Sequence, residues 1–419
     1  MVNTGHDSLN LSTVSLSNGF YQFFIGEGDY NTQVNLPTSG LDFYSFQPMS
    51  DSSIFIGTGT KDTINFCLTP FQNVDDLNIT VLPISDARPG FNATYQLILH
   101  NAGTTKLTGS AALNYDNSKL DFISANEPLA NQTDNILTFD FEDLYPFESI
   151  VIELEFYVLP PPEVNLDDIL IFSANIEPVS DDDTPLDNQF RLEQIVIGAF
   201  DPNDIRVLEG EEILITEVEN YLHYIIRFQN TGTAEAINVR VENRLDDKLD
   251  WATFTLENTS HSNRIEIAEG NQVSFIFEDI YLPDSTSNEP ESHGFIAYKI
   301  KPKNTVMLGD SIFNNADIYF DFNEPIFTNT VFTTIVEPLS ILTLQNTSFK
   351  VFPVPTNGIL KIESTNPILQ VKIYNQLGQL NKLFLRQSEI DISMFPRGIY
   401  FCIIEDETGK IGIEKVVKE

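Results

Sequence analysis

Residues 225–253 read IIRFQNTGTAEAINVRVENRLDDKLDWAT, and this stretch decides the fold class of the chain. An earlier stretch, residues 97–124, matches it with LILHNAGTTKLTGSAALNYDNSKLDFIS. Each begins with an apolar run, reaches an asparagine followed two residues later by glycine, and resumes with alternating apolar and polar residues. Alternation with a period of two is typical of strands with one buried face, and asparagine with glycine is typical of a turn. The two stretches predict tandem copies of one β-module.

Two further matches follow in the same order along the chain. FDFEDLY at 139–145 matches FIFEDIY at 275–281, and ANI at 174–176 matches ADI at 316–318. Short runs of Val, Ile, Phe, Tyr and Thr alternate with Gly, Pro, Asn and Asp, while helical periodicity is almost absent. We therefore predict an all-β fold of tandem immunoglobulin-like β-sandwich modules.

The 419 residues divide into four predicted segments. They are a partial β-sandwich at 1–78, a first repeat at 79–200, a second repeat at 201–338 and a C-terminal module at 345–419. Charge separates the last module from the others, because residues 1–339 hold 14 basic and 53 acidic side chains whereas residues 340–419 hold 9 and 8. We expect the C-terminal module to have a different task from the acidic segments before it.

The first segment predicts a hairpin at Val14–Phe24, with Asn18 and Gly19 at its turn. Strand-like sequence follows Met1 almost at once, which leaves no room for the earlier strands of a sandwich. The N-terminus also has no basic region followed by an apolar stretch, which a secretory leader would need. We therefore expect this chain to have an upstream portion that is missing here.

The composition argues against two classes of function. A net charge of -38 repels phosphate backbones and anionic lipids, so we expect no nucleic-acid binding. The longest apolar run, Ile399 to Ile404, is far shorter than the ~20 residues of a membrane helix, so no transmembrane segment is expected. The two cysteines, Cys67 and Cys402, lie in segments assigned to different modules, and we expect no disulfide between them.

The sequence contains none of the nucleophile, zinc or nucleotide-binding motifs that we sought. Its five histidines show no spacing typical of metal ligands. His223 falls on the polar face of its predicted strand, where a solvated or cross-strand role is expected rather than catalysis. We therefore predict that the chain has no catalytic residues and is not an enzyme.

Two polar loops supply oxygen donors, one with Asp182 among its aspartates and one with Asn203 at the junction of the repeats. The candidate metal ligands in them are Asp181, Asp183, Asp187, Asp201 and Asp204. Carboxylate oxygens in a turn suit Ca²⁺, although the EF-hand pattern fails because an arginine stands where that loop needs glycine. We expect solvated loops and no cofactor, with calcium as the alternative. A bound calcium ion would stiffen the junction between the repeats.

The C-terminal module predicts about seven short strands separated by glycine-containing turns. Four blocks recur in the order of the type A C-terminal sorting domain of the type IX secretion system, and the module resembles that family. The matching residues are Pro353, Pro355, Gly358, Tyr374, Asn375, Gly378, Pro396, Gly398, Tyr400, Lys415 and Lys418. Val354 departs from the family, which usually has asparagine between the two prolines.

The acidic segments also resemble β-sandwich modules of Gram-negative bacterial surface proteins. The second repeat is similar to a functionally uncharacterised domain of those proteins, and residues 19–34 resemble the tail of a Cna-B-type or SdrD-type sandwich. The resemblances imply export through the type IX secretion machinery to the medium or the outer face of the outer membrane.

We therefore expect a non-catalytic, adhesin-like or stalk protein whose ligand is a surface glycan or another protein. The alternative is that the chain is the C-terminal accessory region of a larger secreted protease or glycosidase.

Overall fold

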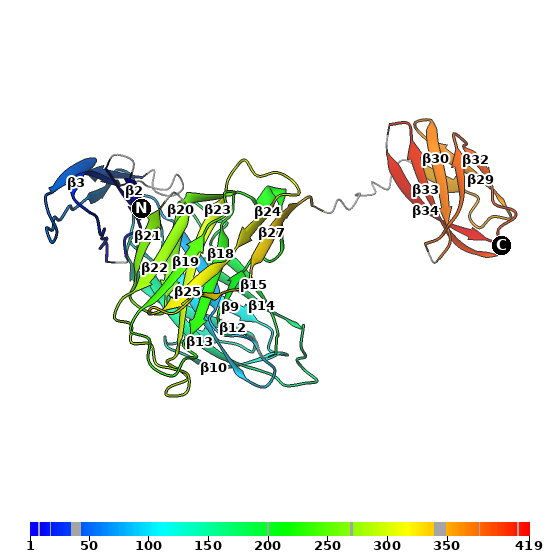
Figure 1. Ribbon diagram of the computed structural model, residues 1–419. Coiled ribbons are helices and arrows are strands. Elements are labelled where there is room, and N and C mark those ends of the chain that lie inside the picture. Colours follow the sequence, from blue (N-terminus) through cyan, green and yellow to red (C-terminus); the bar gives the residue numbers. More distant parts are fainter. Residues whose placement is uncertain are drawn as a thin grey trace. The chain divides into compact units, whose positions relative to one another are not determined.

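The computed structural model describes residues 1–6, 9–16, 18–34, 43–198, 201–268, 271–338, 349–376, 378–408 and 410–419. The chain forms two compact units, Met1–Glu337 and Pro338–Glu419 (Figure 1). Every regular element in the described ranges is a strand, apart from the single 3-10 turn Ile215–Glu217. The predicted all-β fold is confirmed.

The first repeat is a sandwich of two antiparallel sheets around one apolar core. One sheet has the order β10 (Leu120–Ala125), β13 (Ser149–Val158), β8 (Asn92–Asn101) and β7 (Leu77–Pro83). The other has the order β11 (Asn131–Gln132), β12 (Ile136–Leu144), β9 (Leu107–Tyr115), β14 (Ile169–Glu177) and β15 (Gln189–Ile195). Tyr95, Phe156 and Phe172 are fully buried between the sheets with ring centroids 4.5–5.8 Å apart. Such aromatic packing stabilises the core beyond its buried area alone.

The second repeat is built in the same way. One sheet has the order β16 (Asp204–Val207), β18 (Leu222–Gln229), β23 (His293–Pro302) and β20 (Leu249–Thr259). Five strands of a larger sheet face it: β26 (Ile326–Phe327), β25 (Ala316–Phe320), β19 (Val239–Arg244), β22 (Gln272–Phe277) and β21 (Arg264–Ala268). A third small sheet contains β17 (Glu212–Leu214), β27 (Val331–Val336) and β24 (Ser311–Asn314).

The N-terminal strands extend the larger sheet of the second repeat (Figure 1). They are β2 (Leu9–Thr13), β1 (Val2–His6), β3 (Gly28–Val34) and β5 (Ser50–Phe55), while β4 (Tyr44–Gln47) pairs only with β6 (Cys67–Pro70). The link is the pairing of Leu11 and Ser12 with β21. The hairpin predicted at Val14–Phe24 is wrong: a turn forms there, with the Gly19 amide donating to the Leu16 carbonyl, but no strand flanks it.

Asn101 and Asn230 make equivalent hydrogen bonds in the two repeats, as their matched positions predict. Each side-chain amide donates to two backbone carbonyls, at 2.7 and 2.8 Å for Asn101 and at 2.8 and 2.9 Å for Asn230. Each Oδ1 accepts the amide of the glycine two residues later at 3.0 Å. A Cβ on Gly103 would meet the Val74 carbonyl oxygen at 2.4 Å, so a side chain does not fit there.

The two sandwiches pack face to face through β7 and β8 of the first and β18 and β23 of the second. Leu82, Ile98, Ile225, Phe295 and Ala297 form an apolar cluster between them. Every residue of β7 and β18 is buried, because each of these strands has one face in its own core and the other against the neighbouring sandwich. This contact joins the repeats through their sheets and not only through the connecting chain.

The packing also changes the role expected for His223. Its ring is buried, only 9% exposed, and contacts Phe190 of the first repeat at 5.1 Å between centroids. Glu209 Oε1 lies 2.6 Å from His223 Nδ1, and Glu257 Oε1 lies 3.7 Å from Nε2. Although burial opposes protonation, the carboxylates of Glu257 and Glu209 raise the pKa of His223 above its usual value. The solvated alternative was wrong, because the sequence does not show that the first sandwich covers this face. The cross-strand alternative is confirmed, since His223 lies opposite Lys299 of β23 and beside Glu257 of β20.

The C-terminal unit contains seven strands among its described residues, as predicted. One sheet contains β28 (Phe349–Phe352), β29 (Ile359–Ser364) and β32 (Glu389–Asp391). The other contains β31 (Leu380–Leu385), β30 (Ile368–Tyr374), β33 (Gly398–Asp406) and β34 (Ile411–Lys418). Its own core includes Leu360, Val371, Ile390, Cys402 and Val416. Both cysteines are free, and Cys402 is fully buried, as expected.

Candidate functional site

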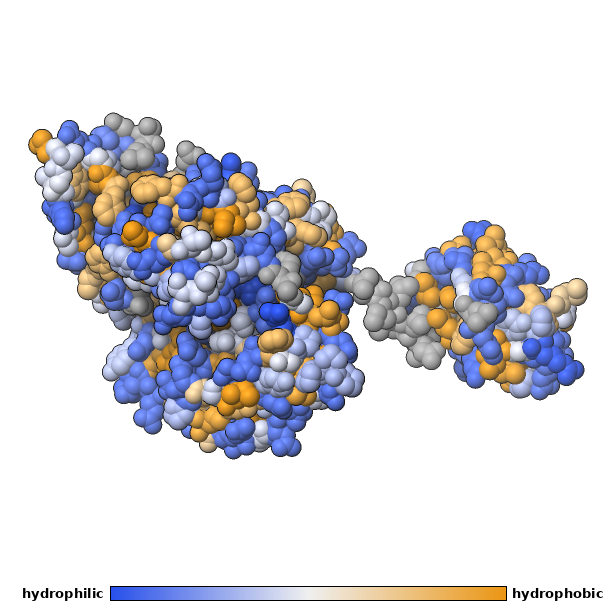
Figure 2. Space-filling view, turned by 60° about the horizontal axis from the view of Figure 1, so that its bottom comes forward, coloured by the Kyte–Doolittle hydropathy of each residue, from blue (hydrophilic) through white to orange (hydrophobic). Residues whose placement is uncertain are grey.

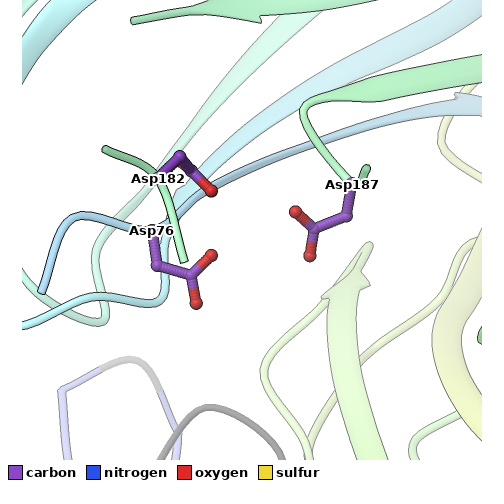
Figure 3. Close-up of side chains that lie close together, drawn as sticks. All are labelled: Asp76, Asp182 and Asp187. Atoms are coloured by element: carbon purple, nitrogen blue, oxygen red, sulfur yellow. The ribbon is translucent and has the colours of Figure 1, made fainter. Parts of the chain in front are cut away.

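Three carboxylates converge at one end of the first sandwich. Asp76 immediately precedes β7, while Asp182 and Asp187 belong to the connection between β14 and β15. One carboxylate oxygen of each residue lies within 4.8 Å of the others, and the three side chains point toward one another (Figure 3). Asp76 is only 2% exposed, whereas Asp182 and Asp187 are partly accessible. We call these three residues the acidic cluster.

Hydrogen bonds from the surrounding chain hold the acidic cluster in place. Asp182 Oδ2 accepts the Leu77 amide at 2.9 Å, and Asp187 Oδ2 accepts Asn78 Nδ2 at 3.1 Å. The Thr184 hydroxyl lies 2.6 Å from Asp76 Oδ1 and 3.1 Å from both oxygens of Asp187. Because it has only one proton to donate, it can bond only one of these two carboxylates at a time. Burial, together with the neighbouring carboxylates of Asp187 and Asp182, raises the pKa of Asp76 to about 7. Oxygen donors in this arrangement can hold a proton or a hard cation.

The acidic cluster contains one of the five predicted metal candidates, Asp187, together with Asp182 of the same predicted loop. Asp181 and Asp183 lie in the same loop but are exposed and outside the cluster. Asp201 closes a local turn by accepting the Asn203 amide at 2.9 Å, and Asp204 is paired with arginines. Asp76 was missed because its partners are more than 100 positions away. The only hint in the sequence was a pair of aspartates directly before a strand.

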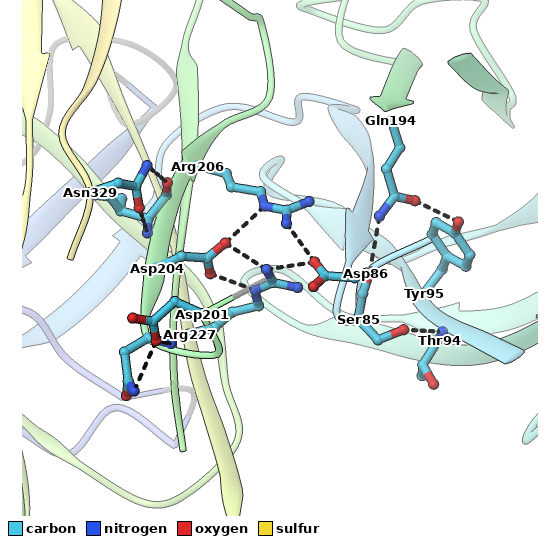
Figure 4. Close-up of polar contacts among 12 residues, drawn as sticks. Ser85, Asp86, Thr94, Tyr95, Gln194, Asp201, Asp204, Arg206, Arg227 and Asn329 are labelled. Atoms are coloured by element: carbon cyan, nitrogen blue, oxygen red, sulfur yellow. Dashed lines mark hydrogen bonds and ion pairs between the residues drawn. The ribbon is translucent and has the colours of Figure 1, made fainter. Parts of the chain in front are cut away.

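Arginines neutralise the carboxylates at the junction between the repeats (Figure 4). Arg227 of β18 binds Asp204 through Nε at 2.7 Å and through Nη2 at 2.6 Å, and the same Nη2 lies 2.7 Å from Asp86 Oδ1. Arg206 also pairs with both Asp204 and Asp86. Because Asp86 belongs to the first repeat, this charged network joins the two sandwiches. Its members are largely desolvated, so each depends on its partners.

A cavity of about 1180 Å³ opens among the N-terminal segment and the two sandwiches. His100, Ser149, Glu257 and Lys299 are among its lining residues. His100 Nδ1 lies 2.8 Å from Ser149 Oγ, its partner across β8 and β13. Burial and the nearby Lys299 lower the pKa of His100 to about 4. A histidine of such low basicity is a weak general base near neutral pH.

The predicted sorting residues mostly shape the C-terminal unit. Tyr400 is buried, and its hydroxyl donates to the Pro396 carbonyl at 2.9 Å. Gly358 has a φ of +151°, and a Cβ there would lie 2.7 Å from Ser393 Cβ, so the position excludes a side chain. Gly378, with a φ of +76°, closes the turn between β30 and β31 by donating to the Asn375 carbonyl.

The other motif residues divide between turn, interior and surface. Pro353 and Pro355 follow β28, and Gly398 begins β33. Tyr374 is partly exposed at the end of β30, Lys415 is exposed on β34, and Lys418 is buried. The predicted turns that include Leu377 and Gly409 involve residues outside the described ranges. The two lysines therefore do not form one basic surface.

Thr356 also shapes the C-terminal unit, although it was not among the predicted sorting residues. It is 3% exposed; its amide donates to the Val417 carbonyl at 2.8 Å and its carbonyl accepts the Glu419 amide at 3.0 Å. These bonds attach the proline-containing turn to the C-terminal end of the chain.

Two family models match the sequence. Residues 350–419 match the secretion system C-terminal sorting domain. The chain carries a type IX secretion sorting domain. Residues 201–334 match a domain of unknown function, DUF7619, which is the uncharacterised domain expected for the second repeat. The sorting domain implies secretion to the medium or the cell surface of a Gram-negative bacterium.

Comparison with curated proteins gives no match. Among solved structures, the BSP domain of a biofilm-associated protein is 9% identical, with 86% of this chain and 84% of that chain covered and a TM-score of 0.25. The collagen adhesin of S. aureus is 13% identical, with 63% and 93% covered and a TM-score of 0.23. The Enterococcus faecalis MSCRAMM ACE is 10% identical, with 63% and 96% covered and a TM-score of 0.24. TM-scores this low carry no argument about function.

Within the described ranges, no helix is long and apolar enough to cross a membrane.

Proposed function

We propose that this chain is a non-catalytic surface protein, adhesin-like or stalk-like, that the sorting domain delivers through type IX secretion. The observation that carries the proposal is the division of the chain into two units with opposite properties. Residues 1–337 form one acidic, sheet-packed body, while residues 338–419 have a core of their own and a nearly balanced charge. A C-terminal unit that packs by itself can be recognised by the secretion machinery independently of residues 1–337, which suits delivery of those residues to the cell exterior.

The body is suited to passive display. Two sandwiches joined by an apolar cluster and by the Asp86–Arg206–Arg227–Asp204 network bend less easily than modules on a linker. Hydrophilic residues dominate the visible face of this body, with smaller hydrophobic patches between them (Figure 2). A strongly acidic surface keeps a displayed protein soluble and disfavours self-association.

A non-catalytic role is supported by the surroundings of two described histidines. His223 is paired with two glutamates, and burial and Lys299 lower the pKa of the His100 ring, which lies beside Ser149. The cavity beside His100 instead offers mixed polar and aromatic contacts, including Tyr21, Tyr44 and Asn258. Such a lining fits binding of a surface glycan or a protein segment better than acyl or glycosyl transfer.

Delivery can be tested in a bacterium with a type IX system, using the chain preceded by a secretory signal peptide. Protease accessibility on intact cells measures surface delivery, and periplasmic fractionation measures retention. Removal of residues 338–419 should trap the body in the periplasm. Gly358→Val should do the same, because its new side chain would overlap Ser393.

Met394→Ala is the matched control in the same unit, because Met394 is 92% exposed and should tolerate truncation. Wild-type surface delivery of the truncated chain would refute the proposal. Hydrolysis of a peptide or glycan by purified full-length protein would refute its non-catalytic part.

A further inference from the structure

We propose that the acidic cluster of Asp76, Asp182 and Asp187 is a calcium site, with the amide oxygen of Asn188 as a fourth protein ligand. The site differs from the loops suggested by the sequence, because its first member comes from the start of β7. It lies at one end of the first sandwich, within the unit Met1–Glu337.

The spacing of the carboxylates fits a single coordination sphere. Calcium binds oxygen at about 2.3–2.6 Å, so two ligands on opposite sides of one ion are about 5 Å apart. The oxygens of the acidic cluster lie within 4.8 Å of one another. One ion can therefore contact all three side chains with only small adjustments.

Asn188 supplies an observation that is independent of the carboxylates. Its side chain is fully buried, and its Nδ2 lies 3.2 Å from Asp182 Oδ2, so its amide group lies against the acidic cluster. The Oδ1 atom of the same amide has no hydrogen-bond partner in the described part of the chain. A buried carbonyl oxygen without a partner is costly. Rotation of the amide by about 180° would bring Oδ1 to the place beside Asp182 that Nδ2 occupies, and coordination to a cation there would remove that cost.

The charge balance around the acidic cluster also calls for a cation. Among the described residues, no lysine or arginine forms an ion pair with Asp76, Asp182 or Asp187. The ammonium group of Lys299 is directed to Asn78 Oδ1 at 3.2 Å and Glu257 Oε1 at 3.7 Å. Lys299 therefore acts on the cluster only from a distance, and the groups that bond the three carboxylates directly are neutral donors, such as the Leu77 amide and the Thr184 hydroxyl.

The chemistry of the ligands selects calcium. Carboxylate, amide and hydroxyl oxygens are hard donors, and an irregular set of them suits the variable geometry of calcium better than the strict octahedron of magnesium. Binding would attach the loop at 181–188 to β7. Extracellular calcium modules bind with Kd values of about 10⁻⁴–10⁻³ M, so we expect occupancy after export.

Calorimetric titration of the full-length chain with CaCl2, after treatment with EDTA, tests the site. We expect a Kd of about 10⁻⁴–10⁻³ M and a Tm increase of about 3–6 °C at saturating calcium. Asp187→Asn and Asp182→Asn should each weaken binding by about tenfold or more, since each removes one charged ligand. Both variants retain an oxygen acceptor, and their Tm in EDTA reports whether they remain folded.

Asp183→Asn is the matched control, because it removes the same charge from the same loop at an exposed position outside the cluster. Its calcium affinity should stay within about twofold of wild type. Equal affinity in all four proteins would overturn the proposal. Equal stabilisation of the wild-type chain by MgCl2 and CaCl2 would also overturn it, because general screening of an acidic surface would then explain the effect.

Discussion

Asp76 and Asp204 are buried aspartates at the start of the first strand of each repeat, yet their surroundings differ. Asp204 is 1% exposed and binds both guanidinium groups of Arg206 and Arg227. Asp76 is 2% exposed and lies beside two further carboxylates. In the second repeat the protein supplies the compensating charge itself. In the first repeat, neutral donors such as Asn78 and Thr184 bond the carboxylates, and the proposed calcium ion would supply the positive charge.

The buried charges of the two repeats also have different structural roles. The arginine network includes Asp86 of the first repeat, so it contributes to the contact between sandwiches. The acidic cluster joins only segments of one sandwich, and its state depends on the solution. The second repeat should therefore respond most to loss of its own arginines, and the first to pH and added ions.

The largest expected effect is the loss of Arg227. Arg227→Met leaves Asp204 buried beside Asp86 with only Arg206 to offset the charge. Breaking a buried ion pair by removing one partner costs about 3–5 kcal/mol. Urea denaturation of the full-length protein should show this loss for the acidic body.

Arg191→Met is the control, because its ion pair with Glu193 is exposed, with side-chain exposures of 58% and 49%. Its cost should stay below about 1 kcal/mol. If both substitutions lower the free energy of unfolding by the same amount, the ion-pair network at the junction does not stabilise the body more than an exposed ion pair does.

The next largest effect tests whether the matched asparagine turns contribute equally to the stability of the two repeats. Asn101→Ala and Asn230→Ala should each destabilise the body by about 2–3 kcal/mol, because each leaves buried backbone groups without partners. Urea denaturation measures both. A silent change at one position and a large loss at the other would show that the matched asparagines are not equivalent.

His100 provides a test of how stability depends on pH. Its counterpart in the second repeat is Gln229, so His100→Gln replaces the histidine with the uncharged residue found at the matching position. The pKa of His100 is about 4 in the fold and near 6.5 when unfolded, so the unfolded chain binds the proton first as the pH falls. Its contribution to stability is complete above pH 6.5 and declines toward pH 4. Between about pH 7 and 4.5, wild type should lose about 1–2 kcal/mol more than His100→Gln. Parallel stability curves for the two proteins would rule out this role.

Salt should have the smallest effect and should distinguish the two units. The body holds 14 basic and 53 acidic side chains, a net charge of -39, and its self-repulsion falls as counterions screen it. Raising NaCl from about 20 to about 200 mM should increase the Tm of the body by about 1–3 °C and leave the sorting domain almost unchanged. A lower Tm of the body at the higher salt concentration would contradict this electrostatic account.

The sequence was sufficient for features that depend on local pattern. Alternating residues predicted the strands, and the matched asparagines and glycines predicted turns that the structure shows in both repeats. The sorting motif was also local, because most of its residues shape turns or fill one small core. The hairpin predicted at Val14–Phe24 was wrong because a turn signal alone does not make the residues on either side pair as strands.

Features that depend on contacts between distant segments could not be predicted. Nothing local shows that β2 pairs with β21, or that the first sandwich covers His223. The acidic cluster needed Asp76 to meet a loop far along the chain, and composition alone cannot select three partners from 61 acidic residues.

The proposed delivery through type IX secretion depends most on the sorting domain folding by itself. Thermal unfolding of residues 338–419 alone, compared with the same unit inside the full-length chain, tests this directly. We predict a cooperative transition with the same Tm in both settings, since the unit has its own buried core. An isolated unit that is unfolded, or whose Tm falls well below its value in the full-length chain, would contradict the account.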